Sequence, residues 1–199
     1  MMYLQQLIER IQENRLKSVY SHDNATVLNG AEKVMKFDCS GLVEMWLRER
    51  YPLALKEVFD YILQVRDTEK YDISRLYSFD FYDFFKNIKN DSREWQRCNI
   101  EDCLQKGDIL AFINPLKKWR WGHMAVVKEE LARNEQKITV KVIDSSANKH
   151  IEDMRQHTGI GQGIIELYFT NNKVEKVCYD GENMRIRHVC IGRLKKIKI

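Results

Sequence analysis

The segments HMAVVK at residues 123–128 and KITVKVID at residues 137–144 set the pattern for the second half of the chain. Both are short runs rich in β-branched residues, as strands are. The pairs Asn171-Asn172 and Asp180-Gly181 supply residues that favour hairpin turns. Further runs of the same kind begin at Asp108, Gly163, Lys173 and Arg187. We therefore predict an antiparallel sheet from about residue 108 onward.

The first half has the spacing of helices instead. Apolar residues recur every three or four positions in the first dozen residues and again in FDCSGLVEMWLRERY at residues 37–51, which predicts a helix that begins near Cys39. Two further stripes lie between Pro52 and Asn90, and the aromatic one is interpreted as core packing. The polar stretch from Ser21 to Gly30 is expected to be a loop.

Helices followed by an antiparallel sheet define an α+β fold class. The 199 residues, 44% of them hydrophobic, suffice for one core, and no Pro/Gly/Ser-rich linker divides them. We expect a single domain over residues 1–199, with a helical insertion at about 52–92. The glycine cluster at 159–163 leads into a strand rather than a helix, so we interpret it as a tight loop feeding an edge strand and not as a phosphate loop.

The formal charge of +4 is concentrated at one end of the chain. Residues 184–199 carry six Lys and Arg residues and no acid, so the rest of the chain is close to neutral. A basic field for nucleic acid is therefore not expected.

The five cysteines are an odd number, which favours reduced thiols over a disulfide framework. The N-terminus lacks the apolar core of a signal peptide, and no stretch of about 18 apolar residues occurs. We expect a protein that is cytoplasmic as synthesised and has no membrane span. Export, if it occurs, would follow a signal-independent route.

Three short motifs occur in an informative order: Asp38-Cys39-Ser40-Gly41 at a helix start, Gly107-Asp108 before a strand, and Gly122-His123 before the next strand. In combination they resemble the NlpC family of bacterial cell-wall cysteine peptidases, a branch of the papain-like clan. The resemblance spans roughly Tyr20 to Ala147. It implies a papain-like fold in which Cys39 is the nucleophile and His123 its base.

Elementary chemistry agrees with these two roles. The nucleophilic form of a cysteine is the thiolate, which the N–H groups and dipole of a helix N-terminus stabilise. We therefore expect Cys39 to be the most reactive thiol, whereas the other four cysteines are read as small structural residues.

A third polar residue should hold the imidazole by its second nitrogen. The resemblance places this residue on the strand after His123, where KITVKVID ends in Asp144. An aspartate departs from the histidine, asparagine or glutamine more usual there, but it can accept from an imidazole N–H. Its alternative interpretation is a residue that simply ends the strand, in which case Ser145, Ser146 or His150 would be tested next.

The substrate-binding residues implied by the resemblance are Tyr20, Asp38 and Ser40. Tyr20 matches an upstream tyrosine that contacts the nucleophile, although it lies farther from Cys39 than usual. Asp38 and Ser40 match positions that recognise the amine and the acyl side of the substrate. Trp121 completes the set, because the run from Lys117 to Trp121 is expected at the lip of the groove.

The function predicted from the sequence is hydrolysis of amide bonds, in peptidoglycan-type peptides, without a metal or organic cofactor. A thiol hydrolase of other acyl or lipid substrates is the nearest alternative. A non-catalytic module is the other, and the Lys/Trp/Arg run at residues 117–121 could bind single-stranded nucleic acid in that case. The partner expected is a peptide or muropeptide, with no nucleic acid.

Overall fold

A computed structural model describes residues 2–13, 16–29, 32–67, 74–116, 122–153, 155 and 158–195. In this part of the chain the helices are α1 (Met2–Gln12), α2 (Cys39–Arg50), α3 (Pro52–Val65) and α4 (Ser78–Lys86). The strands of the first half are β1 (Lys17–Tyr20), β2 (Ala25–Asn29), β3 (Glu32–Phe37) and β4 (Trp95–Cys98). Those of the second half are β5 (Ile109–Ile113), β6 (Gly122–Arg133), β7 (Lys137–Ser146), β8 (Gly159–Thr170), β9 (Lys173–Cys178), β10 (Met184–Ile186) and β11 (His188–Leu194).

The large sheet has eight strands in the order β10-β9-β8-β7-β6-β5-β11-β4, and every neighbouring pair is antiparallel. From β5 to β10 the strands follow one another along the chain, as the predicted meander requires. Asn171 and Asn172 adopt left-handed φ angles of 48° and 62° and turn β8 into β9. The mixed α+β class predicted from the sequence is confirmed.

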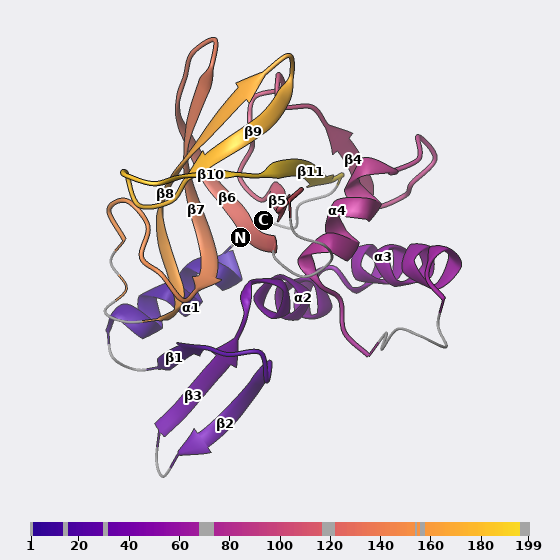
Figure 1. The fold of residues 1–199 in the computed structure, drawn as a ribbon. Helices are drawn as coiled ribbons and strands as arrows, with labels where there is room; N and C mark the ends of the chain where they lie inside the picture. Colours follow the sequence, from indigo (N-terminus) through magenta and orange to yellow (C-terminus); the bar gives the residue numbers. More distant parts are fainter. Residues whose placement is uncertain are drawn as a thin grey trace.

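Both faces of this sheet are buried. Met124 and Val126 of β6 pack in a cluster with Trp46 of α2, whereas the intervening Ala125 belongs to a second cluster with Val142 of β7. Figure 1 shows α2, α3 and α4 gathered on one side of the sheet, with α1 at its other end. Strand β9 also approaches β11, so the sheet curls around the second cluster.

A three-stranded sheet, in the order β1-β3-β2, lies beside α2 and was not predicted. The prediction of a loop from Ser21 to Gly30 is wrong, because Ala25–Asn29 forms β2 and pairs with β3. Thr26 is exposed and Ala25 and Val27 are only partly buried, so β2 lacks the strong apolar alternation on which the prediction of a strand depends.

The interpretation of the glycine cluster at residues 159–163 also needs correction. These residues form the start of β8, which lies between β7 and β9 rather than at an edge. Cβ atoms at Gly161 and Gly163 would collide with the side chains of Arg155 and His150. The glycines therefore leave room for side chains that pack across the strand.

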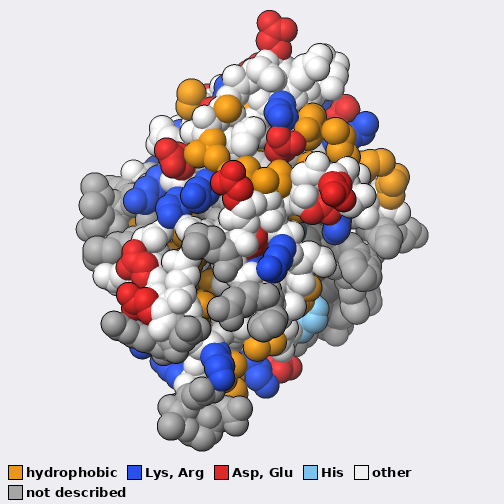
Figure 2. Space-filling view, turned by 90° about the vertical axis from the view of Figure 1, so that its left-hand side faces the viewer, with side chains coloured by type: hydrophobic (Ala, Val, Ile, Leu, Met, Phe, Trp, Pro, Cys, Tyr) orange, Lys and Arg blue, Asp and Glu red, His pale blue; other side chains and the backbone are white. Residues whose placement is uncertain are grey.

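None of the helices in the described ranges is both long and apolar enough to cross a membrane. Figure 2, turned toward the side of β8, shows lysine and arginine side chains interspersed with acidic and apolar ones on that face.

Candidate active site

Cys39 is the first residue of α2, directly after the N-cap residue Asp38. The Asp38 carboxylate accepts a hydrogen bond from the Gly41 N–H at 2.7 Å, so the aspartate ends the preceding strand and starts the helix. The predicted helix start is therefore confirmed. Cys39 is 6% exposed and packs in the cluster between the helices and the sheet.

Burial, together with the charges of Asp38 and Asp144, raises the pKa of the Cys39 thiol from 9.0 to about 12. The backbone N–H groups of Met124 and Ser40 reach the sulfur and lower this pKa, but they do not outweigh burial. The raised pKa favours a neutral Cys39 thiol at rest, which argues against the expectation that Cys39 is the most reactive cysteine and leaves that order to be measured. Cys103 is the exposed cysteine of the described residues.

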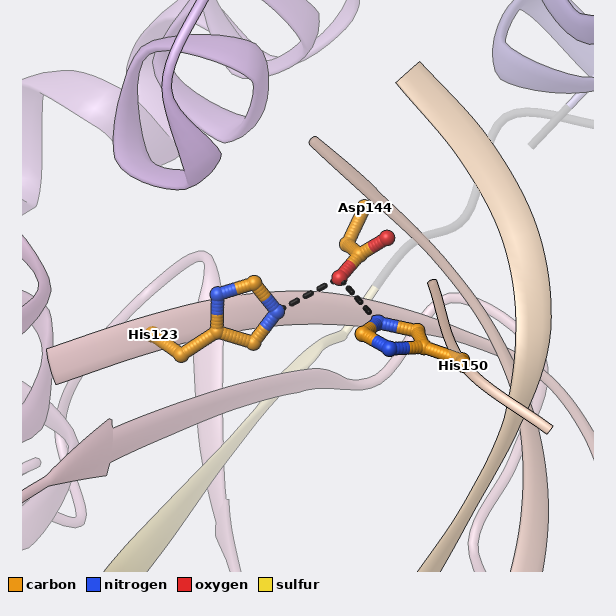
Figure 3. Close-up of side chains that lie close together, drawn as sticks. All are labelled: His123, Asp144 and His150. Atoms are coloured by element: carbon orange, nitrogen blue, oxygen red, sulfur yellow. Dashed lines mark hydrogen bonds and ion pairs between the residues drawn. The ribbon is translucent and has the colours of Figure 1, made fainter. Parts of the chain in front are cut away.

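Asp144 lies near the end of β7 and is buried, with 1% of its surface exposed. Its Oδ2 atom lies 2.5 Å from His123 Nε2 and 2.6 Å from His150 Nε2, and its Oδ1 atom accepts from Arg155 Nη2 at 2.5 Å. Figure 3 shows the two imidazole rings meeting the same carboxylate oxygen from opposite sides. The structure thus brings together His123 and Asp144, which the sequence paired.

The state of this cluster follows from Asp144. Burial alone would raise the pKa of its carboxyl, but His150, Arg155 and His123 outweigh burial and hold that pKa well below 3.8. An ionised carboxylate only accepts hydrogen bonds, so both histidines present an Nε2–H to it. The Nδ1 atom of His123 is then unprotonated and available as a base.

Burial lowers the pKa of His123 below 6.5, and it outweighs the hydrogen bond that His123 donates to Asp144, which raises that pKa. The ring lies beside Phe112 and Tyr179, whose centroids are 5.9 and 5.6 Å away. His123 is therefore a neutral base at neutral pH, held in orientation by apolar neighbours and by Asp144.

Two members of the cluster come from the segment between β7 and β8. From the sequence, His150 was considered only as a replacement for Asp144 in the third catalytic role, and Arg155 was not considered. Arg155 also forms ion pairs with Asp153 at 2.6 Å and donates to the Gly159 carbonyl at 2.9 Å. The signal in the sequence was the small Gly161 and Gly163 opposite them, which have meaning only once β8 lies against this segment.

The three side chains of Figure 3 offer ligand atoms that all lie within 4.8 Å of one another, which raises the question of a metal. A tetrahedral zinc ion would separate its ligand atoms by about 3.4 Å. The two N···O separations of 2.5 and 2.6 Å are those of hydrogen bonds instead. Arg155 adds a positive charge on the other oxygen of Asp144. These residues therefore fit a hydrogen-bonded triad better than a metal centre.

Both carboxylate oxygens of Asp38 also have hydrogen-bond donors. Asp38 Oδ1 accepts from the Ser40 hydroxyl as well as from Gly41, and Oδ2 accepts from His22 Nδ1 at 2.9 Å and Arg75 Nη2 at 2.5 Å. Burial opposes ionisation of Asp38, yet these bonds, led by that from Arg75, lower its pKa below 3.8.

Tyr20 ends β1 and is half-buried. Burial, followed by the negative charge that a Cys39 thiolate would carry, raises the pKa of its phenol, which stays protonated. The tyrosine thus lies within electrostatic range of the thiol. Trp121 and the rest of the basic run at residues 117–121 lie outside the described residues.

The two motif glycines have specific neighbours. A Cβ atom at Gly41 would lie 2.0 Å from Asn24 Oδ1, which accepts from the Asp38 N–H at 2.9 Å. A Cβ atom at Gly122 would lie 2.0 Å from Ser78 Oγ. Gly41 therefore permits the bond between Asn24 and Asp38 at the start of α2, and Gly122 permits the close approach of Ser78 next to His123.

Comparison with known proteins gives no further guide. No family model, curated protein or solved structure matches the chain.

Proposed function

We propose that this protein is a papain-like cysteine peptidase or amidase of NlpC type, in which Cys39 is the nucleophile, His123 the base and Asp144 the residue that orients the base. One observation carries the proposal. Asp144 holds His123 Nε2 at 2.5 Å, while the N–H of the very next residue, Met124, reaches the Cys39 sulfur. The thiol at the helix start and the oriented imidazole are thus associated with adjacent residues of β6, which supports their pairing as nucleophile and base.

The pKa shifts favour a mechanism that starts from a neutral pair. The Cys39 sulfur attacks the carbonyl carbon of an amide as its proton moves to His123 Nδ1. The resulting imidazolium is stabilised by the ionised Asp144, and it then donates the proton to the leaving amine. Water, deprotonated by His123, hydrolyses the thioester and releases the acyl group and the free thiol.

The oxyanion of the tetrahedral intermediate needs hydrogen-bond donors. The first N–H groups of a helix have no partner within the helix, and those of α2 begin at Cys39 itself. The protonated phenol of Tyr20 is a second donor of the required kind. We assign Tyr20 to this role, alongside the start of α2.

The substrate class follows from the resemblance to cell-wall peptidases. We propose peptides of peptidoglycan type, with acyl or lipid thiol hydrolysis as the alternative that shares the same triad. Fold and triad do not separate these substrates, since the shape of the pocket decides which acyl group fits.

Incubation of the purified protein with soluble muropeptides and stem peptides tests both levels of the proposal. Mass spectrometry should show new amine products with the parent enzyme and none with Cys39→Ala, which lacks a nucleophile. Cys103→Ala, which removes an exposed thiol outside the site, is the matched control and should retain the activity. Cleavage of thioesters or acyl lipids alone would replace the substrate class, and equal products from Cys39→Ala would remove the nucleophile.

A further inference from the structure

Arg75 is an unexpected neighbour of the proposed nucleophile. It lies just before α4, and its Nη2 group donates to Asp38 Oδ2 at 2.5 Å and to Ser40 Oγ at 3.2 Å, on the two sides of Cys39. Its Nη1 group donates to the His22 carbonyl at 3.1 Å. The guanidinium also stacks on the Tyr77 ring, 4.4 Å from its centroid. Arg75 is thus held in one orientation.

This contact changes what Asp38 can bind. A substrate ammonium carries only donors and needs a free carboxylate lone pair. Each oxygen of Asp38 already accepts two hydrogen bonds, and the side chain is 4% exposed. The negative charge of Asp38 is balanced by Arg75 at the closest of these contacts. The role in amine recognition that the sequence suggested for Asp38 is therefore blocked by a residue of this chain.

The groups left to a ligand here are donors. A guanidinium has five N–H bonds, and the three contacts of Arg75 leave two of them, one on Nη1 and one on Nε. The Nε–H is buried without an acceptor among the described residues. His22 lies beside the guanidinium and its Nδ1 donates to Asp38, so the neutral ring offers no further donor. The two remaining N–H groups of Arg75 complement oxygen acceptors.

We propose that Arg75 forms a subsite that selects substrates carrying a carboxylate, and no free ammonium, on the acyl side of the bond cleaved at Cys39. This subsite rests on the proposed function for its place in the reaction. Arg75, with 20% of its side chain exposed, donates to the carboxylate while Asp38 keeps the guanidinium fixed.

Three amides that differ only at the N-terminus of the acyl part test the subsite: one with a free amine, one N-acetylated and one N-succinylated. For the parent enzyme we expect kcat/KM to be about tenfold higher for the succinyl than for the acetyl amide, as one charge-assisted hydrogen bond implies. The free amine should be the poorest of the three. A parent enzyme that prefers the free amine would overturn the subsite.

Arg75→Gln should abolish the succinyl preference and improve the free amine, because Asp38 then regains a lone pair. Arg75→Lys, which keeps the charge, should retain part of the preference and guards against a loss caused by misfolding. Arg133→Gln is the matched control, since Arg133 is similarly exposed at 23% but pairs with Glu130 away from the site. An unchanged preference in Arg75→Gln would contradict the assignment.

Calorimetric binding of the succinyl and acetyl peptides to Cys39→Ala separates this subsite from the proposed function. If no amide is hydrolysed, the catalytic proposal fails. The subsite is still supported if the succinyl peptide binds more tightly than the acetyl peptide and Arg75→Gln abolishes this difference. Equal affinity for both peptides would refute it, whether or not catalysis is found.

Discussion

Replacing Asp144 by asparagine tests the proposed site most sharply, because it keeps the shape and changes only the hydrogen-bonding capacity. Asp144 accepts from three donors, with His123 and His150 on Oδ2 and Arg155 on Oδ1. An amide has one acceptor oxygen and one donor group. In Asp144→Asn, the amide N–H must therefore face the N–H groups either of the two histidines or of Arg155, and two donors repel each other.

The loss of stability follows from the burial of Arg155, which would lose its negatively charged partner whichever way the amide turns. Removing one member of a buried ion pair costs about 3–5 kcal/mol, and the remaining bond to Asp153 favours the lower end. At about 2–4 °C per kcal/mol for a chain of this size, Tm should fall by about 6–12 °C.

The same substitution should also lower the catalytic rate. If the amide N–H faces the histidines, His123 Nε2 becomes the acceptor and Nδ1 carries the proton. Nδ1 then cannot take the proton of Cys39. The equivalent tautomer error in a serine protease lowers kcat by about 10⁴-fold, and we expect a loss of about 10³-fold or more in kcat/KM.

Asp108→Asn is the matched control. Asp108 is equally buried and accepts two hydrogen bonds from Arg193, at 2.8 Å each, away from the site. It should lose stability to a similar degree and keep its kcat/KM at temperatures where it is folded. Equal activity losses in Asp108→Asn and Asp144→Asn would show that Asp144 supports the fold only, and parental activity in Asp144→Asn would refute its role altogether.

Three further outcomes are expected. Iodoacetamide should modify the exposed Cys103 before Cys39, as shown by peptide mapping, since the Cys39 pKa is raised to about 12; early labelling of Cys39 would refute the neutral resting thiol. Because His123 acts in its neutral form and its pKa is lowered below 6.5, kcat/KM should rise with pH through a value below 6.5 and then stay level to about pH 9; an acid limb above 6.5 would contradict the effect of burial. Gly41→Ala should lower the free energy of unfolding, measured in urea, by about 1–3 kcal/mol, because the new Cβ displaces Asn24 and this outweighs the better helix propensity of alanine. An unchanged midpoint of unfolding would mean that Asn24 moves without cost.

Local patterns in the sequence predicted those features that depend on neighbours along the chain. The helix start at Cys39 follows from Asp38 as an N-cap and the apolar spacing after it, and the strands around His123 and Asp144 follow from their β-branched runs. The hairpin turn at Asn171-Asn172 follows from the tolerance of asparagine for positive φ. Each of these features is decided within about ten residues, which is why composition and period suffice.

Contacts between distant segments decided the chemistry of the site. Arg155 reaches Asp144 only because β8 pairs with β7, and Arg75 reaches Asp38 across 37 residues of chain. The raised pKa of the Cys39 thiol has the same origin. A helix N-terminus alone favours a thiolate, but burial and two nearby carboxylates raise the thiol pKa instead. Desolvation depends on everything that surrounds an atom, so it is a property of the tertiary structure and has no local signature in the sequence.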